Sequence, residues 1–473
     1  MRKFIPSLLT IAFAAAGAFV LLPATTVTAF FKTPASNEIA TFAKDVAPIV
    51  FKNCAECHRP GEAAPMSLLT YKDARPWAKS IREKVVNRQM PPWHADPRHG
   101  EFRNDRRLTE AEIATIVNWV DNGAKEGDAR HLPPAPTFAE GWGIGQPDLV
   151  LQMPEEFTLE ASGPDEYQNF EIATNFNEDR WVQAVEARPG NRRIVHHILA
   201  LIKPPADPNA PKLTKEEADK QRALQEKESI YYREGFLQRV KADAPVHNNG
   251  CELPNGGSGR QFDTSKRHTL PPVLTLFAPG RDVNNWEPGT ARLIPAGSKL
   301  TLQVHYSKAT GKVEKDRSSI GIVFAKAPPS RVLMSEMVHN SYLKIDPGAE
   351  RHRVTACWTT PKEFQLTAIM PHMHMRGAAM EVKLVYPEGR SEVVLNVPSY
   401  DFAWQTNYSL KRPLTVPKGA TFLITGHFDN SSKNRYNPDP LKAVRWGEPT
   451  YDEMLACFFE YTQESKQALV ATR

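Results

Sequence analysis

Hydrophobic residues recur at helical spacing between residues 37 and 128. The apolar positions of the first part are Ile39, Phe42, Ala43, Val46, Ile49 and Val50. This spacing of three and four places them on one face of a helix. Farther along, Thr109 and Glu112 form a candidate capping box, and Gly123 is placed to end that helix. The pattern predicts a mostly helical region.

From about residue 146 onward, short alternating apolar and polar runs replace the helical pattern. Leu300–Tyr306 is one example, and prolines and glycines separate such runs. This texture is typical of antiparallel sheets, and the β-rich stretch is too long for one ordinary sandwich, so we expect two. The proline-rich stretch 131–136 predicts a stiff linker before them. A charged segment from about 203 to 245 predicts a surface helix or mobile insertion.

The N-terminus has the pattern of an export signal. Arg2 and Lys3 precede an apolar stretch from about Leu8 to Leu22, and Val27–Ala29 offers small residues for cleavage. The alternative is an uncleaved membrane anchor. No later segment has 18 consecutive apolar residues. We therefore expect a signal peptide over residues 1–29, no membrane span in the mature chain, and a secreted or periplasmic protein.

Composition excludes some classes of protein. Proline accounts for 40 of 473 residues, about 8.5%, against a usual ~5%. Because proline breaks helices, one long helical bundle is excluded. The formal charge of +5 is small and spread along the chain, so we expect no nucleic-acid partner.

A C-x-x-C-H motif near the start of the helical region predicts a covalent haem c. Cys54 and Cys57 are placed to add to the haem vinyl groups, and His58 to ligate the iron. The alternatives are a redox pair, a zinc half-site or a structural disulfide. No second C-x-x-C is present to complete a zinc site, and a redox pair does not need the following histidine.

The sixth iron ligand is expected later in the same region. Met90 stands before two prolines, which would hold a loop that presents its thioether to the iron. Met66 and His94 are the competing candidates. The segment from the C-x-x-C-H motif through Met90 to the final helix resembles a class I cytochrome c.

Histidines and one methionine suggest a second kind of metal site. His372 and His374 share one face if they lie in a strand, whereas His196 and His197 bind one metal only at a strand end, bend or loop. Each pair is common by chance. His305 lies on the polar face of its alternating run. Taken alone, it would be read as structural.

Met454 would make the donor set one of imidazoles with one thioether. Soft sulfur together with imidazole favours copper over zinc. Taken alone, a single methionine is more often part of a core.

Together these residues resemble the copper type II, ascorbate-dependent monooxygenases, typified by peptidylglycine α-hydroxylating monooxygenase and dopamine β-monooxygenase. The segments that carry the resemblance are Val195–His197, Leu302–Tyr306, Pro371–Gly377 and Asp452–Met454. The resemblance implies two jelly-roll β-sandwiches and two copper ions. It implies an electron-storing copper on His196, His197 and His305, and an oxygen-binding copper on His372, His374 and Met454.

The chain also departs from that family. The animal enzymes are rich in disulfides, but only Cys251, Cys357 and Cys457 remain outside the haem motif. The resemblance suggests a Cys357–Cys457 pair, since both flank copper-site segments. His427 is a further candidate ligand or proton shuttle, although we favour a structural role at a turn. Because the insertion interrupts the first copper site, no substrate-binding residue is carried over.

The predicted fold class is multidomain: a small all-α cytochrome c-like domain, then two antiparallel β-sandwich (jelly-roll) copper domains. The expected segments are a haem domain over 37–130, a linker over 131–145, and copper domains over 146–335, with an insertion at about 203–270, and over 336–465. The expected function is an exported copper monooxygenase that hydroxylates a C–H bond of a small molecule or peptide. Electrons would come through the tethered haem, or from ascorbate or a redox protein outside the chain. The alternative is a non-catalytic haem and copper protein that transfers electrons or binds copper.

Overall fold

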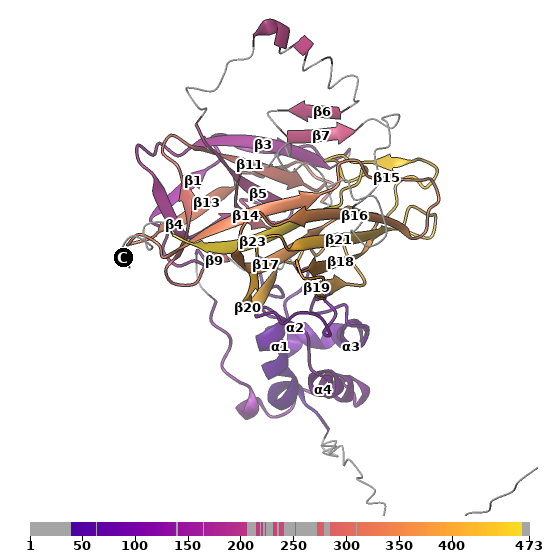
Figure 1. Cartoon of the computed structure of the whole chain (residues 1–473). Helices are drawn as coiled ribbons and strands as arrows, with labels where there is room; N and C mark the ends of the chain where they lie inside the picture. Colours follow the sequence, from indigo (N-terminus) through magenta and orange to yellow (C-terminus); the bar gives the residue numbers. More distant parts are fainter. Residues whose placement is uncertain are drawn as a thin grey trace, which may run out of the picture. The chain divides into compact units, whose positions relative to one another are not determined.

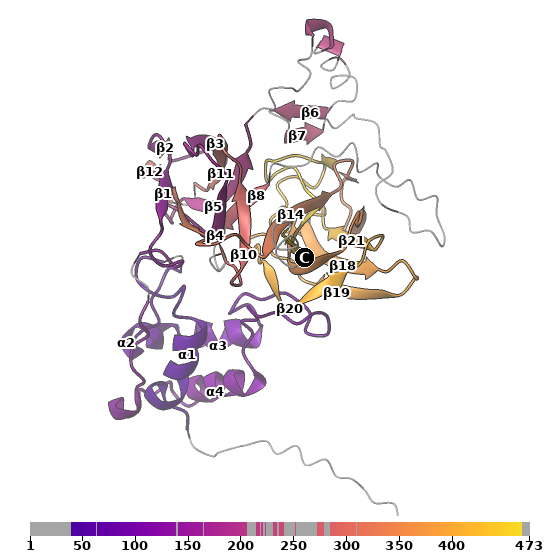
Figure 2. The same cartoon turned by 60° about the vertical axis from the view of Figure 1, so that its left-hand side comes forward.

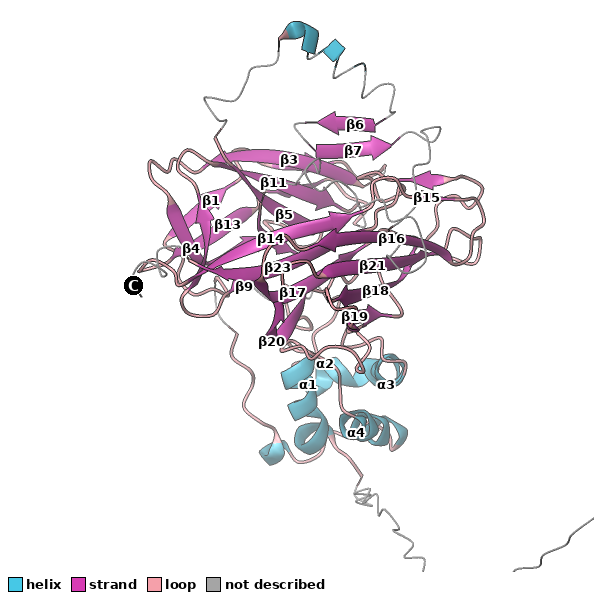
Figure 3. Ribbon diagram, viewed as in Figure 1, coloured by secondary structure: helices cyan, strands magenta, loops and turns pink. Residues whose placement is uncertain are grey.

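Strands dominate the computed structural model of the chain (Figure 3). It describes residues 39–465, apart from 63, 139–140, 164, 206–213, 218, 221–222, 224–229, 234–235, 241–250, 252–271, 279–283 and 309. The predicted signal peptide and most of the predicted insertion lie outside the described residues. No helix in the described part is long and apolar enough to cross a membrane.

Helical residues occur in the insertion, at 215–217, 219–220 and 223, but the labelled helices lie between residues 42 and 131 (Figure 1). They are α1 (Ala47–Asn53), α2 (Tyr71–Ala74), α3 (Ala78–Val86) and α4 (Glu110–Asp121), with a π-helical turn (Phe42–Val46) and 3-10 turns (Arg75–Trp77 and Ala129–His131). The predicted capping box begins α4: the Thr109 hydroxyl accepts from the Glu112 amide, and the Glu112 carboxylate accepts from the Thr109 amide. Their apolar faces pack around Phe42 and Trp119.

The first group of strands builds one apolar core. They are β1 (Leu149–Gln152), β2 (Phe157–Leu159), β3 (Glu166–Ala173), β4 (Arg180–Arg188), β5 (Val195–Lys203), β8 (Val273–Phe277), β9 (Asn284–Asn285), β10 (Thr290–Ile294), β11 (Lys299–Tyr306), β12 (Glu314–Asp316) and β13 (Ser319–Phe324). A separate hairpin of β6 (Ile230–Arg233) and β7 (Phe236–Val240) falls in the insertion. In β11, the buried Leu300, Leu302 and Val304 join this core, as the alternation predicts.

The second group of strands builds another core. They are β14 (Arg331–His339), β15 (Lys344–Ile345), β16 (His352–Thr359), β17 (Phe364–His372), β18 (Gly377–Val385), β19 (Ser391–Val397), β20 (Tyr408–Val416), β21 (Thr421–Phe428), β22 (Val444–Arg445) and β23 (Ala456–Glu464). Trp358, Phe422 and Phe459 stack or tilt against one another in its centre. We call residues 146–325 the first half and residues 331–465 the second half.

One sheet runs through both halves. Its order is β1-β13-β4-β10-β14-β23-β17-β20, with β9 on β4. β10 of the first half pairs in parallel with β14 of the second (Figure 2). A four-stranded sheet, β3-β11-β5-β8, completes the first half, and β16-β21-β18-β19 completes the second.

The predicted fold class, with a separate all-α cytochrome c-like domain and two β-sandwich copper domains, is wrong. Helices α1 to α4 have only 7, 4, 9 and 12 residues and belong to the same compact unit as the strands, Ala40–Arg473. The two halves also share a sheet through β10 and β14. Periodicity shows which face of an element is buried, but not which element covers it, so it did not reveal this continuity.

The segment between α3 and α4 is part of the β structure. Phe102 forms an antiparallel bridge with Leu410 of β20. The Asn104 amide donates to the Asn407 carbonyl at 2.7 Å. Trp93 is buried in the core of the second half. This segment therefore fastens the helices to β20 and to the loop before it.

The disulfide predicted between Cys357 and Cys457 is also wrong. Cys251 pairs with Cys357, and Cys457 is a free, buried thiol on β23. The Cys251 amide donates to the Thr355 hydroxyl at 2.7 Å, which holds this part of the insertion against β16. The pair was expected because both cysteines flank copper-site segments in the sequence. In the fold, however, Cys357 lies on β16 and Cys457 on β23, and these strands belong to different sheets.

Candidate metal centres

A β-bulge brings the first three histidines together. β5 and β11 pair His197 with His305, and the next pairing joins Val195 to Tyr306, so His196 is left without a partner in the ladder. An extra residue of this kind bends the strand and redirects its side chain. The bulge therefore lets both His196 and His197 approach His305. It supplies the bend that two consecutive histidines need in order to share one metal.

The geometry of this trio, which we call the first cluster, matches a metal site. The His197 Nδ1 atom lies 3.4 Å from the His196 Nδ1 and 3.3 Å from the His305 Nδ1. Nitrogens bound to one metal at about 2.0–2.1 Å in a tetrahedral arrangement stand about 3.3 Å apart. One potential ligand atom from each of the three lies within 4.8 Å of those of the others. The trio fits a metal ion bound through Nδ1 atoms.

Two neighbours fix the ring of His305. Its Nε2 atom donates to the Asp165 carboxylate at 2.9 Å, which leaves the lone pair on Nδ1. The Tyr167 ring stacks on the same imidazole, with 4.3 Å between centroids and 7° between planes. Carboxylate partners of this kind orient ligating histidines in metalloproteins.

Burial keeps His196 and His197 of the first cluster neutral. Burial, with the neighbouring His305, lowers the pKa of His196 to about 4. Burial also lowers the pKa of His197 well below its usual value. Burial pushes the pKa of Asp165 upward, but its bonds with His305 outweigh this and lower the pKa overall. Neutral imidazoles beside a carboxylate are the protonation states that a metal requires.

The second cluster, His372, His374 and Met454, lies where two strands end or begin. His372 is the last residue of β17, His374 follows it outside the strand, and Met454 stands just before β23. The His372 Nδ1 contacts the Gln405 side-chain oxygen at 2.7 Å, and the His374 Nδ1 contacts the Asp452 carbonyl at 3.3 Å. When Nδ1 carries the proton, Nε2 keeps the lone pair in both rings. Burial lowers both pKa values.

Glu453 organises the backbone of the second cluster. Its carboxylate is fully buried and accepts from the backbone amides of His374, Arg376 (2.9 Å) and Met454 (3.1 Å). Burial raises its pKa to about 8, although the three amides and the Arg376 charge act in the opposite direction. One side chain thus ties the turn after β17 to the residue that carries the thioether.

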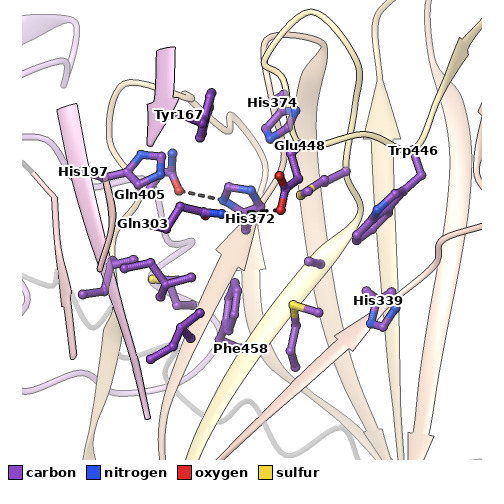
Figure 4. A pocket seen from close by; sticks show the side chains of 17 residues that line it. Tyr167, His197, Gln303, His339, His372, His374, Gln405, Trp446, Glu448 and Phe458 are labelled. Atoms are coloured by element: carbon purple, nitrogen blue, oxygen red, sulfur yellow. Dashed lines mark hydrogen bonds between the residues drawn. The ribbon is translucent and has the colours of Figure 1, made fainter. Parts of the chain in front are cut away.

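One cavity of about 90 Å³ is lined by residues from both clusters (Figure 4). His197 reaches it from the first half, and His372, His374 and Met454 from the second. The wall is mostly apolar, with Leu199, Leu276, Met370 and Phe458, and its polar members include Gln303, Gln405 and Glu448. Both donor sets therefore reach one small, largely apolar space.

The C-x-x-C-H motif follows α1. The amides of Cys57 and His58 donate to the Cys54 carbonyl at 3.2 and 2.9 Å. Both thiols are free, and burial raises the pKa of Cys54 to about 12 and also raises that of Cys57. The His58 Nδ1 lies 3.3 Å from the Met66 carbonyl. This bond leaves the Nε2 lone pair for an axial ligand, so the motif fits a haem.

The candidates for the sixth iron ligand lie in different surroundings. Met66 packs on the same apolar cluster as Cys54. Met90 lines a cavity with Trp93, in whose wall none of the motif residues takes part. His94 lines a different pocket, together with Pro371, which directly precedes His372. The structure therefore brings Met66 to the motif, and the role of Met90 stays a prediction.

Sequence reasoning missed four supporting residues: Asp165, Tyr167, Gln405 and Glu453. Only Glu453 had a signal, because it stands beside Met454. Asp165 and Gln405 reach their histidines across 140 and 33 residues of chain, which no local pattern reports. His427 lies in β21, opposite Arg353 and Ala379, and does not line the cavity.

No protein family model and no curated protein matches the chain. Among solved structures, it is similar to the major capsid protein of bacteriophage PM2, at 9% identity over 67% of this chain and 98% of that one, with a TM-score of 0.24. The VP2 subviral particle of infectious bursal disease virus follows at 7% identity over 72% and 77%, and the mavirus major capsid protein at 8% over 69% and 89%, both with TM-scores of 0.18. Scores this low carry no argument about fold or function.

Proposed function

We propose that this chain is an exported copper-dependent monooxygenase that hydroxylates a C–H bond. The observation that carries the proposal is the cavity that His197 and His372, His374 and Met454 share. Three imidazoles would hold one copper, and two imidazoles with a thioether would hold the other. Imidazoles bind copper among other metals, and the thioether of the second set favours copper, which would supply one-electron chemistry with oxygen. The balanced reaction takes R–H, O2, two electrons and two protons to R–OH and water.

The protein's own residues set the protonation of each imidazole. Asp165 holds the proton of His305 on Nε2, and Gln405 holds that of His372 on Nδ1. Each arrangement leaves a lone pair on the nitrogen that would bind metal. Glu453 fixes the backbone between His374 and Met454. Sites that depend on such partners lose metal affinity when the partners are removed.

The cavity wall is suited to a compact, mostly apolar part of a substrate. Phe458, Met370 and Leu276 give this cavity apolar walls. Gln303 and Glu448 are polar residues of the same wall, and the Gln303 amide donates to the Glu448 carboxylate at 3.4 Å. Convergence of a few polar groups in an apolar pocket is typical of small-molecule sites.

A haem bound at Cys54 and Cys57 would lie on the same compact unit as the copper ligands. The loop after His58 contacts the turn that leads into β5, because Glu62 and Arg192 form an ion pair of 2.9 Å. Only three residues separate Arg192 from His196. This contact supports an intramolecular supply of electrons, with ascorbate or a redox protein as the external donor.

Metal analysis tests the framework. The full chain, produced with haem-maturation machinery, should bind two copper ions. His305→Ala and His372→Ala should each remove one copper and leave the other, whereas His427→Ala should leave both. A stoichiometry of one, or preference for zinc at both sites under reducing conditions, would contradict the proposal.

Oxygen uptake tests the reaction. The reduced, copper-loaded protein should consume oxygen with ascorbate and a panel of C–H substrates, and one of them should yield a hydroxylated product. His372→Ala should abolish product formation. Binding of both metals without product from any substrate would instead favour the non-catalytic electron-transfer protein.

A further inference from the structure

The loop between β19 and β20, residues 398–407, contacts the segment His372–His374, which carries two ligands of the second cluster. The Gln405 oxygen accepts from His372, and the Tyr400 hydroxyl bonds the Met373 backbone at 2.8 and 3.0 Å. The Phe402 ring meets the His374 ring edge-on, at 5.8 Å and 79°. One loop thus contacts each residue from 372 to 374.

Phe402 also contacts the first cluster. Its ring stacks on His196, with 5.5 Å between centroids and 20° between planes. Because His196 belongs to the first half and His374 to the second, one aromatic ring touches a ligand of each cluster. Phenylalanine has only two side-chain torsions, so it spans the two imidazoles with little freedom.

The loop is anchored from outside by the segment between α3 and α4. The Ser409 amide donates to the Asn104 side chain at 3.1 Å, and the Asn104 amide group donates to Asn407 at 2.7 Å. Trp93 meets Tyr408 edge-on at 5.0 Å. The C-terminal end of the loop that carries Phe402 is therefore fixed to this segment.

We propose that Phe402 is a positioning residue that fixes the separation of the two clusters and closes the space between His196 and His374 to water. The proposal rests on the proposed function only insofar as the clusters hold copper. The closure itself is a property of the metal-free protein. A ring that merely filled space would be replaced by leucine without consequence for either cluster.

The first test uses the metal-free full chain and diethylpyrocarbonate, with modification of each histidine followed by peptide mapping. Phe402→Leu should raise the modification rates of His196 and His374 about tenfold, the scale of a lost aromatic contact. Phe402→Tyr keeps the ring and should behave as the original protein. His427, outside both clusters, should react equally in all three. Unchanged rates in a Phe402→Leu protein that melts normally would overturn the closure.

The second test measures the distance between two Cu(II) ions by dipolar electron paramagnetic resonance. The original protein and Phe402→Tyr should give one narrow distance, and Phe402→Leu a broader distribution. An unchanged distribution in Phe402→Leu would overturn the positioning role. If only one copper binds, the proposed function fails, whereas the diethylpyrocarbonate result still decides the role of Phe402.

Discussion

His305 and Asp165 form a hydrogen bond of 2.9 Å between Nε2 and Oδ2, and this bond determines which nitrogen of His305 is free. With the proton on Nε2, the Nδ1 lone pair faces the Nδ1 of His197 at 3.3 Å. That lone pair accepts the Nδ1 proton of His197 or, when His197 carries its proton on Nε2, can bind a metal ion together with the His197 Nδ1. The pair therefore poises the first cluster to bind a cation.

Removal of that carboxylate should weaken the first copper site and spare the second. We expect Asp165→Ala to lower the affinity of one copper by about 10–100-fold, because His305 loses its orientation and its fixed tautomer. Competition with a Cu(I) chelator measures both affinities. Asp148→Ala is the control, since Asp148 also accepts a backbone amide, from Phe324, but lies away from both clusters. Equal affinities in both variants would exclude a role for Asp165.

Replacement of Glu453 should destabilise the fold as well as the second site. Glu453→Ala leaves the buried amides of His374, Arg376 and Met454 without their acceptor. At roughly 1 kcal/mol for each, the free energy of unfolding should fall by about 3 kcal/mol. Urea denaturation of the metal-free chain measures this. Glu350→Ala removes an exposed ion pair with Lys433 and should change stability by less than about 1 kcal/mol. A similar small loss in Glu453→Ala would contradict the argument.

The disulfide should contribute measurably to stability. Cys251 and Cys357 are 106 residues apart, so their link restricts a long loop in the unfolded chain. We expect Cys251→Ala to cost about 2–5 kcal/mol of unfolding free energy. Cys457→Ala, which removes a free buried thiol, should cost about 1 kcal/mol. Peptide mapping without reductant checks the pairing, and a Cys357–Cys457 peptide would contradict the Cys251–Cys357 link.

Sequence patterns predicted local features better than long-range ones. The alternation in Leu300–Tyr306 gave the buried face of β11, and the capping box at Thr109 begins α4. Both depend on residues within one element. The continuous sheet depends instead on the pairing of β10 with β14, and no pattern within either strand specifies its partner.

The site shows the same contrast. Consecutive His196 and His197 required a bend, and the bulge in β5 supplies one. His372 and His374 were expected to share a strand face, but His374 lies beyond the end of β17. Asp165 and Phe402 come from loops whose position depends on distant contacts. The sequence therefore predicted the candidate metal ligands from their residue types. It did not predict the residues that orient those ligands.

The C-x-x-C-H motif should carry one covalent haem. Cys54 and Cys57 are free, lie in consecutive turns after α1, and have a histidine whose Nδ1 is already bonded. Protein made with haem-maturation machinery should keep its haem in acidified organic solvent, and Cys57→Ala should weaken or abolish that attachment. Cys457→Ala is the matched control and should keep it. Extraction of haem from the original protein would refute the motif's assignment.

Loss of a sulfur-to-iron charge-transfer band should identify the sixth ligand. Met90→Ala should abolish the band if Met90 binds the iron. Survival of the band in Met90→Ala and its loss in Met66→Ala would assign the role to Met66, which packs on the same cluster as Cys54. Absence of the band from the original protein would point to His94 or to an open position.

Acid should destabilise the metal-free protein through the buried imidazoles. In the unfolded chain a histidine has a pKa near 6.5, and burial lowers that of His196 to about 4 in the fold. Between these values the unfolded state binds more protons, so the free energy of unfolding falls as the pH drops from about 6.5 toward 4. His196 alone accounts for about 3 kcal/mol, since each pKa unit corresponds to about 1.4 kcal/mol. Above pH 6.5 its contribution is complete and constant.

Urea titrations at several pH values should show a shallower decline for His196→Ala, while His131→Ala, at an exposed position, should keep the original slope. An equal slope in the original protein and His196→Ala would mean that His196 is solvated in the metal-free state, and that the first cluster is not preformed.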